Sequence, residues 1–348
     1  VEVLEAYDSA RLGAIDRLLV KVSSPLDKPF KPVFFVLSGG LAGYNAWDVV
    51  EGPELVPARG NATYLLKPRF VGFAIPPGRA FRVLVFEAEN FTLKGESEVH
   101  YIRPSELTWL RNPDLAYWSY DVVKGVEEPF AWDFVSCREG VGEEAWAGEV
   151  DGAALLKVEG LERSEGEWLM AGLWQSVEFP AELKIKVKPM FSTPLSPKPS
   201  RVVGVEVGYG QWDWATHRRV SKYDDIPYRA LWIVFTNETQ EPVLVKSELS
   251  ENLALYYVPV EVGEWNEVEV NVTRLIQALN WTPPEPELFT YRGGGLLEPQ
   301  PYLQGSVAYL ARRAELTLFV AAYPWDPRAE GRFEAYFDFV DTVPYEPT

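Results

Sequence analysis

Short runs rich in Val, Phe, Tyr and Leu recur about every ten residues along this chain, and Pro, Gly and Asn separate them. Branched and aromatic side chains suit a pleated, half-buried strand, whereas Pro, Gly and Asn favour turns. Long amphipathic helical patterns are missing. The sequence therefore predicts an all-β protein with many short strands.

Residues 1–103 contain seven of these runs, which fits an immunoglobulin-like β-sandwich. The pattern Cys-Trp-Cys of true immunoglobulin domains is absent, so only the architecture is predicted. The seven predicted strands are Val1 to Ala6, Asp16 to Ser23, Lys31 to Ser38, Trp47 to Val49, Thr63 to Phe70, Ala80 to Glu87 and Ser97 to Ile102.

Residues 104–129 have a different texture, with short turns around the aromatic residues Trp109, Tyr117, Trp118 and Tyr120. Aromatic side chains in a linker need burial, so this segment is predicted to be an aromatic-rich packed connector between two domains.

Residues 130–348 hold roughly ten more runs, which fit a larger jelly-roll β-sandwich. Residues 272–279 are expected to form one or two helical turns capped by Thr273. The ten predicted strands are Ala131 to Ser136, Ala153 to Val158, Trp168 to Val177, Ala181 to Pro189, Arg201 to Tyr209, Ala230 to Thr236, Leu253 to Pro259, Glu267 to Val272, Leu316 to Ala322 and Phe333 to Thr342.

Four stretches in residues 130–348 carry a resemblance: Phe130-Ala131-Trp132-Asp133-Phe134, the run from Gly152 to Val158, Trp174-Gln175-Ser176-Val177, and the run from Gly263 to Val268. Together they resemble galactose-binding-like jelly-roll modules, which are carbohydrate-binding-module-like domains. The resemblance implies glycan binding or a spacer role, and it implies that a structural calcium ion is common.

Five of the nine asparagines lie in Asn-x-Thr sequons, where chance would give about one. They are Asn61, Asn90, Asn237, Asn271 and Asn280. The enrichment predicts covalent N-glycans and an extracellular or cell-surface protein. Because the chain begins at Val1, we expect a signal peptide to have been removed. Accidental turn chemistry is the alternative explanation.

Composition narrows the function further. Cys137 is the only cysteine, so an intrachain disulfide is excluded. Few Asn, Gln, Cys and Met beside 28 Pro indicate a thermophile, and N-glycosylation then favours an archaeal cell surface. A net charge of −18 argues against nucleic acid, and the apolar runs are far too short for a transmembrane segment.

An aromatic and basic segment is the candidate surface for glycan stacking. It contains Tyr209, Trp212, Trp214, Arg218, Arg219 and Tyr223, and in an extended chain Trp212 and Trp214 point to the same face. Rings of this kind stack on sugars, but they are also frequent in cores and subunit interfaces, which is the alternative.

Acidic residues suggest two further sites. Asp133, Asp338 and Asp341 would come together around calcium if the first and last strands of the second domain pair, and solvated carboxylates are the alternative. Glu267 with Glu269, and Glu149 with Asp151, share strand faces as a glycosidase pair would, but such pairs usually mark a solvated edge strand. With only His100 and His217, serine-hydrolase and zinc-protease motifs are missing, and no cofactor is required.

These observations lead to a non-catalytic extracellular structural protein, a subunit of a cell-surface filament, pilus-like thread or surface layer. Its partners would be copies of itself, joined by addition of the strand Val1 to Ala6 to a neighbouring sheet. A carbohydrate-binding module of a surface glycoprotein is the alternative, with a glycan as ligand. A glycoside hydrolase using Glu267 and Glu269 is the more distant one.

Overall fold

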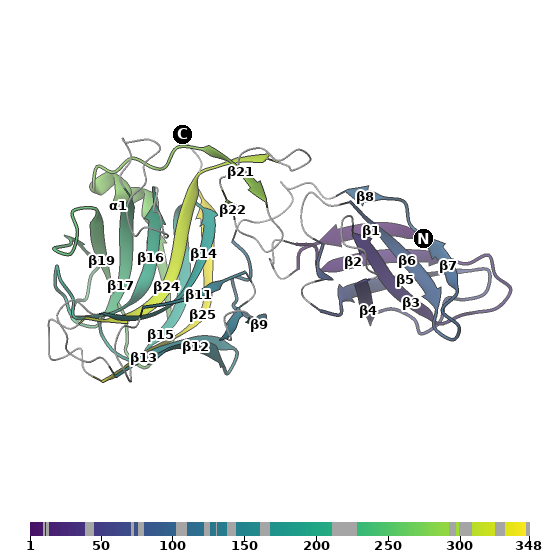
Figure 1. Cartoon of the computed structure of the whole chain (residues 1–348), viewed down its shortest axis with the longest axis horizontal. Helices are drawn as coiled ribbons and strands as arrows, with labels where there is room; N and C mark the ends of the chain where they lie inside the picture. The colour runs from purple at the N-terminus through teal and green to yellow at the C-terminus, as the bar shows by residue number, and fades with distance from the viewer. Residues whose placement is uncertain are drawn as a thin grey trace. The chain divides into compact units, whose positions relative to one another are not determined.

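The chain is nearly all β-structure, as a computed structural model shows, and the predicted all-β class is confirmed. The structure describes residues 1–9, 11, 14–38, 45–70, 73–75, 80–101, 110–121, 126–129, 131–137, 144–160, 168–210, 228–291, 297–298, 308–323 and 331–345. These residues form strands β1 to β25 and the helix α1 (Figure 1). No helix in this part of the chain is long and apolar enough to cross a membrane.

Two compact units divide after Arg111, inside the segment 104–129 that was predicted to be the connector. The described residues of that segment from Asn112 onward belong to the second unit, where they include strands β9 (Trp118–Asp121) and β10 (Val126–Pro129). A hydrogen bond ties Asn112 to the second unit, because its backbone oxygen accepts from Trp132 Nε1 at 3.2 Å.

Eight strands of the first unit form one sheet in the order β1-β2-β5-β4-β3-β6-β7, with β8 also pairing with β6. The strands are β1 (Glu2–Tyr7), β2 (Arg17–Ser23), β3 (Pro32–Ser38), β4 (Asn45–Glu51), β5 (Asn61–Pro68), β6 (Ala80–Glu87), β7 (Leu93–Glu96) and β8 (His100–Tyr101). The short β7 was not predicted, and among the described residues of the run Ser97 to Ile102 only those of β8 form a strand.

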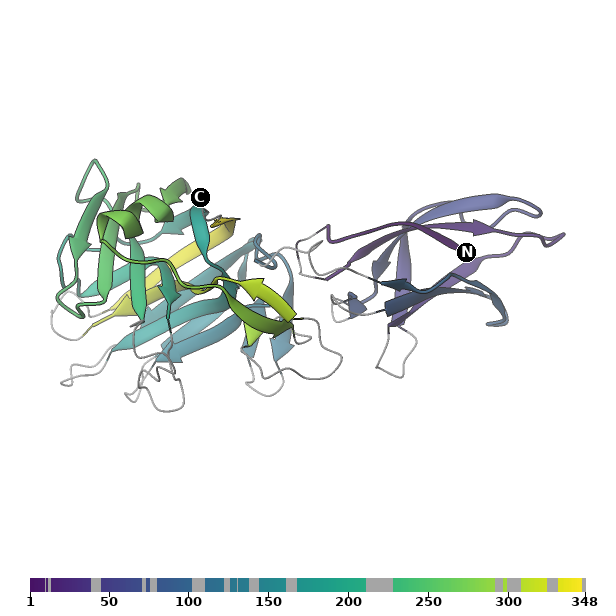
Figure 2. The same cartoon turned by 90° about the horizontal axis from the view of Figure 1, so that it is seen from above.

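This sheet curls around a single core (Figure 2). Leu18 on β2, Phe34 on β3 and Val83 on β6 belong to one buried cluster, although β2 and β6 are not neighbours in the sheet. The two edges also approach each other, because a Cβ on Gly95 of β7 would lie 3.2 Å from Val1 Cγ2. An immunoglobulin-like sandwich has two separate sheets, whereas here β4 pairs with both β5 and β3 and joins the layers into one.

The N-terminal segment Val1 to Ala6 lies in this sheet, where β1 pairs with β2 of the same chain. Val1 and Val3 pack against the core, while most of the strand is exposed. Addition of this segment to a neighbouring copy stays a prediction, and it would require the pairing with β2 to be exchanged.

The second unit is a β-sandwich of two large sheets, as predicted. A seven-stranded sheet has the order β11-β14-β24-β16-β17-β19-β18, and a five-stranded sheet has the order β12-β13-β25-β15-β20. The strands of the first are β11 (Asp133–Cys137), β14 (Leu169–Glu178), β24 (Arg313–Ala322), β16 (Arg201–Tyr209), β17 (Arg229–Thr236), β19 (Leu253–Pro259) and β18 (Val243–Lys246). Those of the second are β12 (Glu144–Val150), β13 (Ala153–Glu159), β25 (Arg332–Pro344), β15 (Pro180–Pro189) and β20 (Asn266–Asn271).

Apolar side chains fill the space between these sheets. Val203, Val205 and Val207 of β16 are buried on one side, and Leu183 and Ile185 of β15 are buried on the other. A smaller sheet is formed by β21 (Glu287–Tyr291), β22 (Leu297–Glu298) and β23 (Ala308–Ala311).

Helix α1 (Val272–Ala278) covers the region predicted to be helical, but its cap differs from the prediction. Asn271 is the N-cap, because its Oδ1 accepts a hydrogen bond from the backbone N–H of Arg274 at 2.8 Å. Thr273 lies inside the first turn instead. A cap side chain must precede the helix to reach its free N–H groups, and Asn271 holds that position.

Replacing Phe34 by Ala should destabilise the first unit by roughly 3–5 kcal/mol, because its ring is 1 % exposed and packs 5.0 Å from the Tyr64 ring. Phe70→Ala is the matched control, since that ring is 62 % exposed, and its effect should stay within about 0.5 kcal/mol. Urea denaturation of both variants measures the difference, and equal effects would contradict the assignment of the core.

Candidate functional site

The seven-stranded sheet presents a row of polar and aromatic residues on the face turned away from the five-stranded sheet, which we call the outer face. Asp133, Trp174, Thr317, Glu206 and Trp232 lie directly opposite one another on β11, β14, β24, β16 and β17. Residues opposite each other in a sheet share a face, so this register places two indole rings and two carboxylates in one cross-strand row.

Glu206 lies between Thr317 and Trp232 in the row, and two donors hold its carboxylate. Tyr228 Oη donates to Oε1 at 2.7 Å, and Trp232 Nε1 donates to Oε2 at 2.6 Å. A Cβ on Gly208 would overlap the Tyr228 hydroxyl, so this glycine makes room for the tyrosine on the strand. Burial raises the pKa of Glu206, while the bonds from Tyr228 and Trp232 lower it.

Glu315 is a third carboxylate of the outer face, outside the row. It lies on β24 opposite Gly208, one diagonal step from Glu206, and it is only 7 % exposed. Burial raises its pKa to about 7, with Arg313 lowering it and Glu206 raising it further. Arg313 Nη2 lies 3.5 Å from Glu315 Oε1, and its Nε donates to Ser176 Oγ at 2.9 Å. The two acids therefore have different surroundings within one site.

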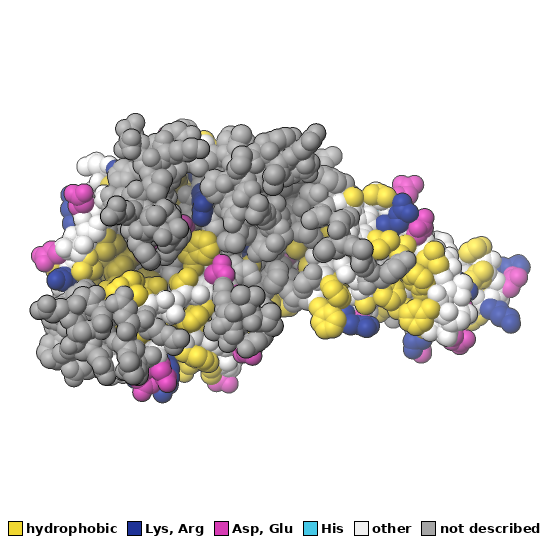
Figure 3. Space-filling view, in the orientation of Figure 1, with side chains coloured by type: hydrophobic (Ala, Val, Ile, Leu, Met, Phe, Trp, Pro, Cys, Tyr) yellow, Lys and Arg dark blue, Asp and Glu magenta, His cyan; other side chains and the backbone are white. Residues whose placement is uncertain are grey.

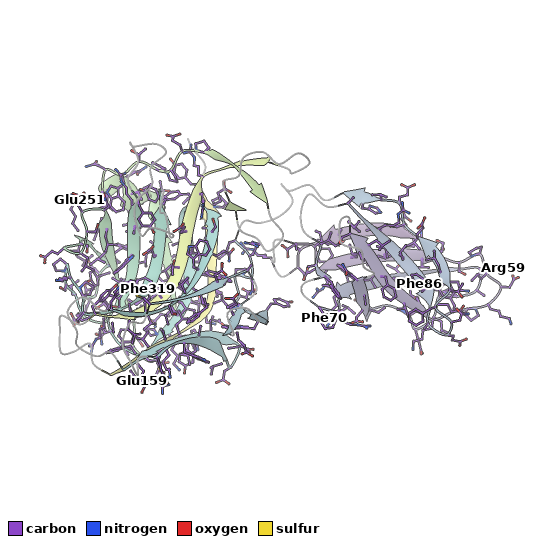
Figure 4. The ribbon with its side chains drawn as sticks, in the orientation of Figure 1. Arg59, Phe70, Phe86, Glu159, Glu251 and Phe319 are labelled. Atoms are coloured by element: carbon purple, nitrogen blue, oxygen red, sulfur yellow. The ribbon has the colours of Figure 1, made fainter. Side chains whose placement is uncertain are left out.

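Aromatic rings flank these carboxylates. Trp168 and Tyr323 stack with centroids 5.8 Å apart and an angle of 4° between their planes, and Trp232 stacks on Tyr323 at 6.5 Å. Phe319, labelled in Figure 4, lies 5.1 Å from Trp232. Trp168, Trp174, Tyr228 and Trp232 are only partly buried, so rings and an acid reach the surface together.

Of the predicted glycan-stacking residues, the structure describes only Tyr209. Tyr209 is 2 % exposed, and its ring packs on Phe179 at 5.1 Å, so it belongs to the core. Tyr209 is the last residue of β16, and its side chain points toward the five-stranded sheet and not to the outer face. Burial raises its pKa to about 12. Trp212, Trp214, Arg218, Arg219 and Tyr223 lie outside the described residues.

The strand pairing assumed for the calcium prediction does not form, and calcium binding itself stays a prediction. Asp133 lies on β11 of the seven-stranded sheet, whereas Asp338 and Asp341 lie on β25 of the five-stranded sheet. Asp338 pairs with Lys186 at 2.6 Å. The described residues contain no group of three or more His, Cys, Asp and Glu that could hold a metal ion. Because β11 and β25 lie in different sheets, Asp133 does not come beside Asp338 and Asp341 by strand pairing.

The predicted acid pairs occupy exposed strand faces. Glu267 and Glu269 are exposed on β20, an edge strand, and Glu269 pairs with Lys184 at 2.8 Å. Glu149 and Asp151 are exposed at the end of β12 and in the following turn. His100 stacks on Phe81 at 5.3 Å, and His217 lies outside the described residues.

All five sequon asparagines are exposed, which is what glycosylation requires, and their occupancy stays a prediction. Asn61 begins β5, and Asn90 lies in the turn between β6 and β7. Asn237 follows β17, Asn271 caps α1, and Asn280 follows the helix with a positive φ of 54°. Asn tolerates that conformation at a helix C-terminus, so this asparagine also has a structural reason to be present.

Glu206 and Glu315 were not predicted as functional residues, although a signal for them exists in the sequence. Each is a single acid inside an apolar run, Val-Gly-Val-Glu-Val-Gly for Glu206 and Ala-Glu-Leu-Thr-Leu for Glu315. Their meeting on one face could not be read from the sequence, because it depends on the order of β16 and β24 in the sheet.

No family model and no curated protein matches the chain. Among solved structures, a CBM61 module in complex with β-1,4-galactotriose is 10 % identical, with 68 % of this chain and 99 % of that chain covered and a TM-score of 0.26. A carbohydrate-binding module of the β-sandwich superfamily is 12 % identical, with 94 % and 98 % covered and a TM-score of 0.29.

The secreted serine protease VesC from Vibrio cholerae is 9 % identical, with 99 % of this chain and 49 % of that chain covered and a TM-score of 0.21. Two of these three structures are thus carbohydrate-binding modules, the class that the sequence resembles. TM-scores this low do not establish a common fold, so the fold rests on the chain's own strand order and the site on its own side chains.

The stability of the second unit should fall as pH rises from about 4.5 to about 7, because folded Glu315 retains a proton that the unfolded chain releases. Relative to Glu315→Gln, the wild type should lose up to about 3 kcal/mol over this range. Denaturant titrations at pH 4 and pH 8 measure it, with exposed Glu267→Gln as the control. An equal pH dependence in wild type and Glu315→Gln would contradict the burial of this acid.

Proposed function

We propose that the second unit binds a glycan on the outer face of its seven-stranded sheet. The observation that supports it is the cross-strand row in which Glu206 lies between Trp174 and Trp232 on the same face. Ligand sites combine aromatic surface with a few oriented polar groups, and this row has both.

The chemistry of the site suits a neutral polyhydroxyl ligand. Partly exposed indole and phenol rings offer flat apolar faces to sugar C–H groups, and a carboxylate accepts hydrogen bonds from hydroxyls. Glu206 already receives one bond at each oxygen, which fixes its orientation and leaves further lone pairs for a ligand. A net charge of −18 disfavours polyanionic ligands.

Extracellular location, N-glycosylation, an archaeal source and assembly into a filament stay predictions from the sequence. Glycan binding by the second unit is compatible with each of them, because a surface protein meets glycans on its own cell and on others.

A glycan array followed by calorimetry on the best ligand tests the proposal. Trp232→Ala should weaken binding at least about tenfold, since a stacking ring contributes on the order of 1.5 kcal/mol or more. Glu206→Gln should weaken binding while keeping the shape of the site. Trp146→Ala is the matched control, because Trp146 is 42 % exposed on β12 of the other sheet.

Unchanged melting temperatures would show that the variants are folded. Equal affinity in Trp232→Ala and Trp146→Ala, or binding that is lost in the Trp146→Ala control, would place the site elsewhere.

Glycoside hydrolysis is a second candidate function. The carboxylates of Glu206 and Glu315 on the outer face favour it. Hydrolysis needs one protonated carboxyl to give its proton to the leaving oxygen and one carboxylate to take a proton from the attacking water. Glu315 has the raised pKa that suits the donor, and Glu206 has the oriented oxygens that suit the acceptor. Water adds across the glycosidic bond, and solvent then restores both acids.

Incubation with polysaccharides and 4-nitrophenyl glycosides decides between binding and hydrolysis. If the wild type releases product, Glu315→Gln should lower kcat by roughly 10²-fold or more, while Glu269→Gln on β20 should leave kcat unchanged. Binding without any release of product would reject hydrolysis and leave glycan binding in place.

A further inference from the structure

Phe91 occupies an unfavourable place in the first unit. It lies in the turn between β6 and β7, its side chain is 61 % exposed, and its φ is +52°. A bulky residue with positive φ is an outlier that costs free energy, and exposed apolar surface adds to that cost. The turn thus holds a large apolar ring in water at the expense of stability.

Hydrogen bonds hold the backbone of this turn in its conformation. The backbone N–H of Phe91 donates to the Glu87 oxygen at 3.0 Å, and the N–H of Glu87 donates to the Thr92 oxygen at 2.9 Å. Lys94 and Glu87 form an ion pair at 2.8 Å across the same turn. A conformation that is costly for one residue and fixed by its neighbours points to a use for that residue.

Phe91 is one of three phenylalanines that meet on the outside of the curled sheet. Phe35 of β3 lies 5.6 Å from Phe86 of β6 in an edge-to-face arrangement, and 6.4 Å from Phe91. Leu93 of β7 is opposite Phe86 and 48 % exposed. We call Phe35, Phe86, Phe91 and Leu93 the phenylalanine patch.

Hydrophobic side chains gather on the visible face of the first unit, with charged side chains toward its rim (Figure 3). Phe86 is labelled in Figure 4. Exposed apolar patches on soluble proteins usually have an occupant.

The occupant is suggested by the neighbour of Phe91. Asn90-Phe91-Thr92 is a sequon, so Phe91 is its central residue. Asn90 is exposed, and its Oδ1 accepts the backbone N–H of Thr92 at 3.0 Å. Its side-chain amide also forms a hydrogen bond with the Glu87 carboxylate. Nδ2 is the atom that bears the sugar in an N-glycan, and it keeps one N–H for Glu87 after attachment. A glycan attached there starts one residue from the exposed ring.

We propose that Asn90 carries an N-glycan whose first sugars lie on the phenylalanine patch. In the attachment, Nδ2 loses a proton and bonds to C1 of the sugar, and the lipid diphosphate of a lipid-linked oligosaccharide donor is the leaving group. The C–H faces of the sugars cover the rings of Phe91 and Phe35, while the sugar hydroxyls remain in water. Sugar contacts then offset the strain and exposure of Phe91.

This proposal is independent of glycan binding by the second unit, because it concerns a covalent glycan on the first. It also explains why a phenylalanine stands at position 91, between Asn90 and Thr92, although a sequon accepts any residue except proline there.

The test uses the full chain secreted from N-glycosylating cells, with occupancy at each sequon measured by glycopeptide mass spectrometry. Asn90→Gln should lower the melting temperature of the first unit by roughly 2–4 °C in the wild-type background. In a Phe91→Gly background the same change should have little effect. Glycine suits the positive φ, so this variant removes the ring without straining the turn.

Asn61→Gln is the matched control, since that sequon carries Ala62 in place of a phenylalanine and should shift the melting temperature equally in both backgrounds. An unoccupied Asn90, or equal shifts for Asn90→Gln with and without Phe91, would overturn the proposal. So would sedimentation that shows the glycosylated wild type to be a dimer that Phe91→Gly dissociates, because a second copy would then cover the patch.

Discussion

Burial of the seven-stranded sheet on both faces is the constraint on which the second unit depends. Strand β24 lies between β14 and β16, and nine of its ten residues are buried. A strand covered on both sides gains from nearly every apolar side chain that it carries, but it also imposes a desolvation cost on any charge. Glu315 bears that cost, and the rise in its pKa is the direct result.

The same burial bears on the proposal that the outer face binds a ligand. Glu206 and Glu315 are kept in surroundings that oppose their ionisation, and Tyr228, Trp232 and Arg313 supply the bonds and charge that compensate them. Structural packing alone would be served as well by apolar residues at both positions. Two buried acids beside half-exposed rings therefore support the proposed binding of a ligand.

The first unit buries one face of a single sheet by curling that sheet around its core. Curling brings the start of β1 beside β7, so that both edges of the sheet lie close together. Unpaired edges invite other strands, and an approach of this kind protects them. The outside of the sheet then carries the phenylalanine patch, where Phe91 and Leu93 remain exposed.

The sequence by itself determined the all-β class, the position of most strands and the places where glycans can attach, because alternating burial, turn residues and sequons are local properties. Val20 and Val22 alternate with the polar residues Lys21 and Ser23 in the sequence, and the two valines are buried in the sheet. Strand order was decided only by the tertiary structure, since it depends on contacts between distant segments. That order separates Asp133 from Asp338, turns Tyr209 toward the core, and brings Glu206 and Glu315 to one face. Side chains far apart in sequence meet only when the sheet places their strands side by side, so the chemistry of the site could not be read before the fold was known.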